Sequence, residues 1–400
     1  MAAVVWPAVY FKFLSPALAL EASVFTYVIS YFTRPAGALV FGYLGDRAGR
    51  RGALVATLIL SGGAIFGIAL TPGYSSIGVY GAALIILFRL MFGLALGGEF
   101  GGAQSWLSEF AGDRRRGLWN SIVMTALPLG IGLAALSFLL TIDSFGPAGF
   151  VSYAWRYPFL FGGFAVMAGI IVRYRLQESP MFTRLREERR LAANPVREAF
   201  SMNWKKMIPL FLLNAPGLAF ALIEGNGPIP IAFGGALHVP SSTVIEAQAI
   251  GAFVAVPVVV LGGVAGDRFG RKPVVAASLL LMLVLAVPAF ALMKSGGLLS
   301  NTVAQIIVAC SWGVSTGGVL GALYSEQFPT AHRYTASGVV FNVSSLFGSL
   351  AGGILAPAIA VAYGGYVAAY LPLAGITMVL SLAALAALFF VKESSKEGLG

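Results

Sequence analysis

Long apolar runs alternate with short polar connections along almost the whole chain. Eleven of these runs have about 20 residues or more, the length that a helix needs to cross the hydrocarbon core of a bilayer. They cover, to within a few residues, positions 20–44, 52–71, 81–107, 117–140, 154–174, 205–230, 243–265, 273–293, 300–323, 335–359 and 366–391. The pattern predicts an all-α polytopic membrane protein.

A ten-residue motif occurs twice, each time between two apolar runs. Residues 42–51 (GYLGDRAGRR) and 263–272 (GVAGDRFGRK) share it, and Asp46 and Asp267 stand 221 positions apart in a chain of 400. The glycines allow a turn too tight for side chains. Each aspartate can accept hydrogen bonds from the exposed N–H groups at the start of the helix that follows. The repeat predicts two matching halves, each a bundle of helices.

The first helix of such a plan is expected to be incomplete. Residues 1–14 are apolar but too short to cross a bilayer alone. In the second half Asp267 stands 62 positions after Lys205, whereas in the first half Asp46 stands only 45 positions after Met1. Relative to two six-helix halves, about half a helix is therefore missing. A start assigned too far downstream, a shortened chain and a truly short helix would each give this pattern.

Charge predicts how the helices are oriented. The chain has 26 Lys and Arg against 16 Asp and Glu, yet 58% of its residues are hydrophobic. In a soluble protein the excess of positive charge would suggest nucleic acid. Here the basic residues gather at helix ends on one side, and the other side holds only Lys12 and Lys294. The basic side, with the C-terminus, is therefore expected to face the cytoplasm. We expect a monomer that is embedded in the lipid bilayer of the cell membrane and does not bind nucleic acid.

One long polar segment, residues 177–203, separates the two halves. We therefore divide the chain into an N-terminal bundle (1–175), a cytoplasmic linker (176–204) and a C-terminal bundle (205–400). Within the linker, residues 183–191 could form an amphipathic helix on the membrane surface. A solvated tether is the interpretation that we favour.

Two arginines interrupt the apolar runs of the first half. A charge in mid-membrane is costly and marks a candidate functional site. Arg34 and Arg89 can each hold a carboxylate through the planar fork of the guanidinium group. The alternative is that each hydrogen-bonds backbone carbonyls and braces its helix. Both interpretations stay open for Arg34.

Two glutamates complete the set of candidate substrate-binding or proton-binding residues. Glu99 lies ten residues after Arg89, so a direct pair between them is not expected. Glu99 can carry a proton or can brace a neighbouring helix. Glu224 lies near the outer end of its helix beside a Gly/Pro break, which favours an outer gate or a water-exposed residue over a central site.

A second repeated feature predicts a gate. Glu109 and Glu326 each follow a serine and close a helix at the basic side. There they face the arginines of the ten-residue motifs and can pair with them when that side closes. The candidate cytoplasmic gate consists of Asp46, Arg47, Arg50, Glu109, Asp267, Arg268, Arg271, Glu326 and Arg333.

In this order, the motifs resemble those of the metabolite:proton symporter branch of the major facilitator superfamily, which carries osmolytes and organic acids. The resemblance depends on Arg34-Pro35 with Gly37, the two ten-residue motifs, Arg89 with Gly93, and residues 97–102, 155–159, 175–182 and 324–338, followed by Asn342. Sugar porters share several of these blocks, so the resemblance is carried by the ordered set.

The resemblance implies two six-helix bundles that rock about a central site. It implies that Arg89 matches the branch's membrane arginine associated with proton coupling, and that Asp46 and Asp267 help to lock the cytoplasmic side. The branch's first helix normally carries a Glu-Trp-aromatic-Asp block. This chain begins downstream of it, which leaves the contribution of that helix open.

We therefore predict a secondary active transporter that moves a small organic solute, an organic acid or zwitterion bearing a carboxylate, by proton-coupled symport. A sugar-type porter and a drug-efflux antiporter are the alternatives; the antiporter's proline–glycine signature appears only in part, at residues 128–132. Two scattered histidines and one cysteine, Cys310, offer no catalytic or metal cluster. We expect no enzyme, no metal and no cofactor other than the coupling proton.

Overall fold

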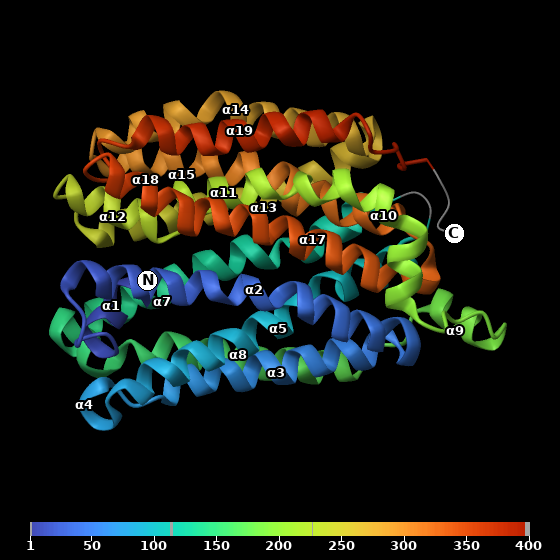
Figure 1. The fold of residues 1–400 in the computed structure, drawn as a ribbon, viewed down its shortest axis with the longest axis horizontal. Coiled ribbons are helices and arrows are strands. Elements are labelled where there is room, and N and C mark those ends of the chain that lie inside the picture. Colours follow the sequence, from blue (N-terminus) through green and yellow to red (C-terminus); the bar gives the residue numbers. More distant parts are fainter. Residues whose placement is uncertain (1, 113–114, 226, 397–400) are drawn as a thin grey trace.

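The protein is described by a computed structural model that covers residues 2–112, 115–225 and 227–396. Within these ranges it is helical and contains no strand, and eleven helical runs are long and apolar enough to cross a membrane. The predicted all-α class and the eleven runs are thereby confirmed. Figure 1 shows the helices lying side by side along one direction, with the first half (blue to green) against the second (yellow to red).

The described part of the first half contains two short helices, α1 and α4, and five long helical runs. Its elements are α1 (Ala2–Val9), α2 (Pro16–Ala48), α3 (Arg50–Leu70), α4 (Tyr74–Ile77), α5 (Val79–Phe110), α6 (Arg116–Met124), α7 (Ala126–Gly149), η1 (Phe150–Ala154) and α8 (Arg156–Tyr174). At eight residues α1 is far too short to span a bilayer. It agrees with the incomplete first helix that the repeat predicts.

The second half follows after α9 (Pro180–Glu187). Its elements are α10 (Pro195–Leu213), α11 (Ala215–Ile223), α12 (Pro228–Ala236), α13 (Ser241–Phe269), α14 (Arg271–Lys294), α15 (Leu298–Trp312), η2 (Gly313–Val319), α16 (Leu320–Glu326), η3 (Thr330–His332), α17 (Arg333–Leu350), η4 (Ala351–Leu355), α18 (Ala356–Ala362) and α19 (Tyr370–Leu388). Helix α10 begins at Pro195, within the predicted linker (176–204) and nine residues before its predicted end.

The apolar run at 205–230 is broken in the structure. Pro216 has no N–H to donate, so the helix is interrupted at Asn214, between α10 and α11. At this break the Asn214 side chain donates from Nδ2 to Ser345 Oγ at 2.9 Å and accepts at Oδ1 from Thr316 Oγ1 at 2.8 Å. The break thereby places a polar group at mid-bundle.

The two ten-residue motifs turn as the sequence predicts. Gly49 has a φ of +126° between α2 and α3, and Gly270 has a φ of +100° between α13 and α14. Side chains other than glycine rarely adopt this region, so both turns depend on the glycine. Figure 1 shows α9 and the C-terminus at one end of the bundles, which we call the linker end, and α4 and α12 at the other, the far end.

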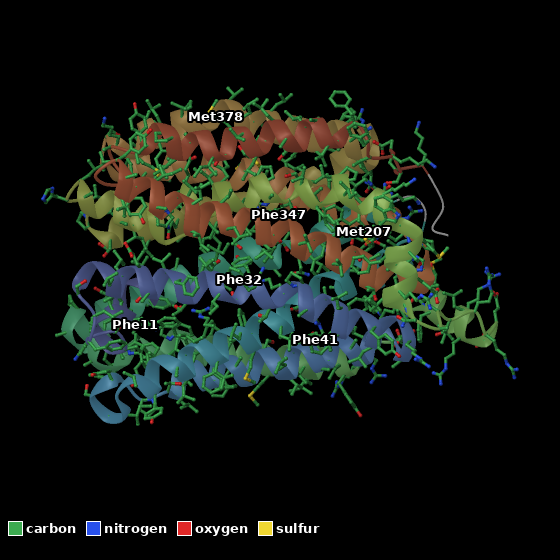
Figure 2. All side chains as sticks on the ribbon, in the orientation of Figure 1. Phe11, Phe32, Phe41, Met207, Phe347 and Met378 are labelled. Atoms are coloured by element: carbon green, nitrogen blue, oxygen red, sulfur yellow. The ribbon has the colours of Figure 1, made fainter. Side chains whose placement is uncertain are left out.

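The outer surface has the character of a lipid-facing one. Large apolar side chains remain exposed along the helices, such as Phe32 at 44% and Phe347 at 42%, both labelled in Figure 2. Figure 2 also shows nitrogen-bearing side chains gathered around the linker end. A soluble monomer rarely exposes so much contiguous apolar surface.

Candidate functional site

A first charge cluster joins the two bundles at the linker end. We define it by Asp46 on α2, Arg50 on α3, Glu109 on α5 and Arg333 on α17. Arg50 Nη1 lies 3.0 Å from Asp46 Oδ1, and Arg50 Nη2 lies 3.4 Å from Glu109 Oε1. Arg333 Nη1 lies 3.1 Å from the same Glu109 oxygen. All four side chains are fully buried, so Glu109 bridges an arginine from each bundle without help from water.

Asp46 also binds the start of a helix in the opposite bundle. Its Oδ1 accepts from the Tyr334 N–H at 3.2 Å, and its Oδ2 accepts from the N–H and hydroxyl of Thr335 at 2.9 and 2.7 Å. These are the second and third residues of α17, where N–H groups lack helical partners and the helix dipole favours an anion. The expectation that Asp46 serves the helix that follows it is therefore wrong.

A second charge cluster repeats the first with the bundles exchanged. We define it by Asp267 on α13, Arg271 on α14, Glu326 on α16 and Arg116 on α6. Arg271 Nη1 lies 2.8 Å from Asp267 Oδ1, and Arg271 Nη2 lies 2.8 Å from Glu326 Oε1. Arg116 Nη1 lies 3.2 Å from that same Glu326 oxygen. Arg116 thus matches Arg333, a role that sequence reasoning did not assign to it.

The aspartate of the second cluster caps the corresponding helix of the first bundle. Asp267 accepts from the Gly117 N–H at 2.9 Å and from the Leu118 N–H at 2.8 Å, at the second and third residues of α6. The two caps therefore cross the interface in opposite directions. The approach is close, because a Cβ added at Gly117 would lie 2.4 Å from the Gly263 carbonyl oxygen.

Two Glu-Ser pairs, also not identified from the sequence, support these clusters. Glu178 accepts from the first two N–H groups of α3 at 3.1 and 3.2 Å, and Glu393 accepts from the first two of α14 at 2.9 and 2.8 Å. Ser179 donates to the glutamate of the first cluster, and Ser394 donates to that of the second at 2.7 Å. The repeated Glu-Ser after the last span of each half was the available signal.

Glu393 is an acid outside the spans whose ionisation is perturbed. Burial raises the pKa of its carboxyl, but backbone N–H groups of Arg271, Lys272 and Ser395 hydrogen-bond the carboxylate and oppose this effect. The net result is a pKa below the ordinary value for glutamate. The cap on α14 is therefore a carboxylate at neutral pH.

Two of the candidate gate residues do not enter the clusters. The Arg47 guanidinium lies 5.7 Å from the centroid of the Tyr43 ring, and that of Arg268 lies 5.3 Å from the Phe269 ring. Both arginines are exposed. Side chains that point outward from the motif turn cannot reach the buried carboxylates, so the structure separates these two from the other seven candidates.

A cavity of about 560 Å³ lies between the bundles, beyond the two charge clusters in the direction of the far end. Phe100 and Phe341 stack across the interface with parallel rings and line part of its wall. Its polar lining from the first half consists of Tyr27, Tyr31, Arg34, Glu99, Gln104 and Arg173; that from the second consists of Asn214, Gln248, Gln305, Thr316 and Ser345. Charge is thus confined to one wall, and the other offers amides and hydroxyls.

Arg34 lies on the charged wall as a guanidinium without an acid. Its Cζ is 3.8 Å from the centroid of the Tyr31 ring, so the cation rests on the aromatic face. Its Nε is buried without a hydrogen-bond partner. Among the described residues, no carboxylate forms an ion pair with it. This geometry does not match the alternative in which Arg34 only braces its helix.

Glu99 forms an ion pair with a residue that the sequence did not suggest. Its Oε1 lies 2.8 Å from Arg173 Nη2 on α8, and both side chains are about a quarter exposed, at 28% and 22%. As expected, Glu99 does not pair with Arg89. The Glu99–Arg173 pair is net neutral and leaves the Arg34 charge uncompensated on the same wall.

Arg89 lies outside the central cavity. It borders a separate pocket of about 190 Å³ within the first bundle, and it is buried to 8% exposure. Its Cζ lies 4.8 Å from the centroid of the Trp6 ring, which α1 supplies. Arg89 and Arg34 were alternative candidates for holding a carboxylate, and of the two only Arg34 lines the central cavity.

Glu224 is not the water-exposed residue that the Gly/Pro break suggested. It is fully buried just after the end of α11, and neither carboxyl oxygen has a hydrogen-bond partner.

No group of acids, histidines or cysteines in the described part of the chain is arranged to hold a metal ion.

Comparison with known proteins accounts for this arrangement. The sequence pattern of the family described as "Sugar (and other) transporter" matches residues 8–206 and 236–399. The inner membrane metabolite transport protein YhjE of Escherichia coli is 32% identical over 95% of this chain and 88% of its own length. The glycine betaine/proline/ectoine/pipecolic acid transporter OusA of Dickeya dadantii is 29% identical over 98% and 78%.

The fold is also that of solved transporters. The crystal structure of a D-xylose–proton symporter superposes with a TM-score of 0.73 over all of this chain and 94% of that one, at 20% identity. A second structure, a proton:xylose symporter described as a major facilitator superfamily protein, superposes with a TM-score of 0.72. With two helical bundles, a cavity between them and this family match, the chain belongs to the sugar (and other) transporter family, has the fold of solved major facilitator transporters and is an integral membrane transporter.

Proposed function

We propose that this transporter moves a small organic solute bearing a carboxylate by proton-coupled symport with alternating access. The observation that carries the proposal is Arg34, a permanent cation on the cavity wall with no acid paired to it. A fixed cation inside a membrane protein needs an anion. A carboxylate on the solute supplies it through two parallel hydrogen bonds to the guanidinium fork.

The neutral wall fits the remainder of such a solute. Asn214, Gln248 and Gln305 contribute amides, and Trp312 contributes an aromatic face to the same cavity. A volume of about 560 Å³ accepts a compact zwitterion with its hydration water. The names of relatives such as OusA, which mention betaine and proline, support this class of solute.

A sugar or polyol is the second candidate. Amide and hydroxyl side chains line one wall, and they are the groups that hydrogen-bond a neutral polyol. Solved relatives of this fold include xylose–proton symporters. A sugar would leave the Arg34 charge unmatched, and for that reason we favour the carboxylate.

We further propose that the linker end is cytoplasmic and that the two charge clusters close it in the outward-facing state. The excess of Lys and Arg at helix ends on that side supports the orientation. The caps from Asp46 and Asp267 cross the interface, so both must break before the bundles separate there. In this proposal α2–α8 and α10–α19 move as two rigid units joined by the α9 linker, and one chain suffices.

The test is uptake into proteoliposomes with an imposed pH gradient. The probes are radiolabelled glycine betaine, proline, succinate and xylose. We expect accumulation of a carboxylate-bearing probe that follows the gradient, and slower uptake in Arg34→Lys, where charge is kept but the fork is lost. The exposed arginine in Arg47→Lys is the matched control and should transport normally.

The proposal fails if uptake ignores the pH gradient, or if Arg34→Lys transports a carboxylate-bearing probe at the wild-type rate. Accumulation of xylose alone would support the second candidate. Drug efflux by antiport would instead appear as uptake of a drug into inverted vesicles in exchange for protons that leave them.

A further inference from the structure

The buried acids of the spans differ in one respect, which is whether a cation faces them. Asp46 and Glu109 pair with arginines of the first cluster, and Asp267 and Glu326 pair with those of the second. Glu99 pairs with Arg173. Among the described residues, Glu224 is the buried acid that has neither an ion pair nor a hydrogen bond to its carboxyl oxygens.

The elements packed around Glu224 provide no charge to compensate it. Helix α11 contacts α10, α12, α14, α15, α17, η4 and α19. Of the ionisable groups on these elements, Arg271 and Arg333 lie in the charge clusters, and Lys294 Nζ lies 5.1 Å from the centroid of the Tyr370 ring. The remaining ones are Cys310 on α15, Arg197, Glu198, Lys205 and Lys206 on α10, Lys272 on α14 and Tyr334 on α17, and none of them hydrogen-bonds the Glu224 carboxyl.

The residues around Glu224 connect it to the central cavity. Ala221 and Gly225 line the cavity, whereas Glu224 does not. Two cavity-lining glutamines hold this part of the wall: Gln305 Nε2 donates to the Glu224 carbonyl at 2.9 Å, and Gln248 Nε2 donates to the Gly225 carbonyl at 3.0 Å. The Glu224 carboxyl therefore lies one layer behind the wall that the solute touches.

An ionised carboxylate without a partner is strongly disfavoured in such a place, whereas the neutral acid is tolerated. Releasing the proton therefore requires that water or a cation reach Glu224. The two amides that hold the wall at Glu224 and Gly225 would have to yield for this. Loss of the hydrogen bonds from Gln305 and Gln248 to the cavity wall and release of the proton from Glu224 are thereby linked.

We propose that Glu224 binds the coupling proton of the transport cycle. It takes a proton from water on one side of the membrane, carries it as a neutral acid while the cavity is closed, and returns it to water on the other side. No bond to the solute forms or breaks. The inference rests on the proposed symport and places its proton in the second bundle, away from Arg34 and Arg89.

The first test does not depend on the solute. Infrared difference spectra of the purified full-length protein, recorded while the pH is raised, should show loss of the carbonyl-stretch band of a protonated carboxylic acid. Glu224→Gln should lack this band. The matched control is Glu246→Gln, which changes an exposed acid on α13 and should keep it. Identical spectra for wild type and Glu224→Gln overturn the inference.

The second test separates coupling from solute binding. Glutamine has the shape of the protonated acid, so Glu224→Gln should keep at least half of the wild-type exchange of radiolabelled glycine betaine between equal pools. It should lose at least tenfold in accumulation driven by a pH gradient, and Glu224→Asp should recover part of it. Wild-type accumulation in Glu224→Gln, or equal loss of exchange and accumulation, overturns the inference. If the wild type itself ignores the gradient, the symport fails, and the infrared band still decides whether Glu224 holds a proton.

Discussion

The linker end and the central cavity use the internal repeat in opposite ways. At the linker end each half supplies the same set of an aspartate cap, an arginine bridge and a Glu-Ser pair, and each aspartate binds a helix of the other half. In the cavity, one wall carries Arg34 and the Glu99–Arg173 pair, while the other wall carries no charge. Two related bundles can be joined at one end by the same set of contacts made twice. Binding an asymmetric solute between them requires two walls of different chemistry.

The two clusters are alike in chemistry but unequal in burial. The Asp46 side chain is 0% exposed, whereas that of Asp267 is 15% exposed. Water screens the second cluster more, so each of its hydrogen bonds contributes less. In the proposed closure of the linker end, this difference makes the first cluster the stronger of the two.

The largest expected effect comes from breaking the stronger lock. Asp46→Asn removes charge-assisted hydrogen bonds to the start of α17, which should cost the closed linker end about 2 kcal/mol, or roughly 30-fold in its population. The measurement is alkylation of a cysteine in Ser105→Cys, made in Cys310→Ser; the Ser105 hydroxyl lies 3.3 Å from that of Ser337 across the interface. Labelling that stays at the parent rate would contradict this lock, and Arg47→Gln is the control.

The matching change in the second cluster should act less strongly. Asp267→Asn should raise labelling of the same cysteine by roughly fivefold, about 1 kcal/mol, because its carboxylate is partly hydrated. Equal increases in labelling for the two substitutions would mean that the difference in burial between Asp46 and Asp267 does not affect closure. In the double variant the two free-energy costs should approximately add, since the clusters share no residue.

Arg34 and Arg89 should affect transport in different ways. Arg34→Lys should raise the KM for a carboxylate solute roughly fivefold, because a fork with two hydrogen bonds becomes a point charge. Arg89→Lys should leave KM within about twofold, since Arg89 lies outside the cavity. Initial rates over a range of solute concentrations distinguish the two, and equal changes in KM would place both arginines in one site.

The smallest effect concerns the cap on α14. Glu393 has a lowered pKa, so its stabilisation is complete above the ordinary glutamate value of about 4.3 and is lost as pH falls through the lower folded value. Glu393→Gln should cost about 1 kcal/mol at pH 7. The difference in melting temperature between it and the wild type should vanish toward acid. A constant difference across pH would mean that the charge of Glu393 is not involved.

The periodic features could be read from the sequence because they depend on local composition. The eleven spans follow from apolar length, and the turns at Gly49 and Gly270 follow from the repeated motif. That Asp46 and Asp267 cap helices of the opposite bundle did not follow. Such caps depend on how the two bundles dock, a tertiary property that spacing along one chain does not encode.

The cavity was predicted less well for the same reason. Arg34 was identified because a charge in an apolar run is visible in the sequence. Arg173, however, stands among the basic residues of the linker end in the sequence, and its side chain reaches Glu99, 74 positions away. Arg89 was a candidate for holding a carboxylate because its place in an apolar run can be read from the sequence, whereas the face that it occupies within the packed bundle cannot. The burial of Glu224, just before a Gly/Pro break, likewise depends on neighbours distant in sequence.

The central claim, that Arg34 on the charged wall holds a carboxylate, is tested most directly by binding to the purified protein. Isothermal titration would compare glycine betaine with its methyl ester, in the wild type and in Arg34→Lys. The account predicts that wild type prefers the free carboxylate by at least about tenfold, in line with roughly 1.5–3 kcal/mol for a charged hydrogen bond, and that Arg34→Lys loses most of this preference. Equal preference in the two proteins, or none in the wild type, would contradict it.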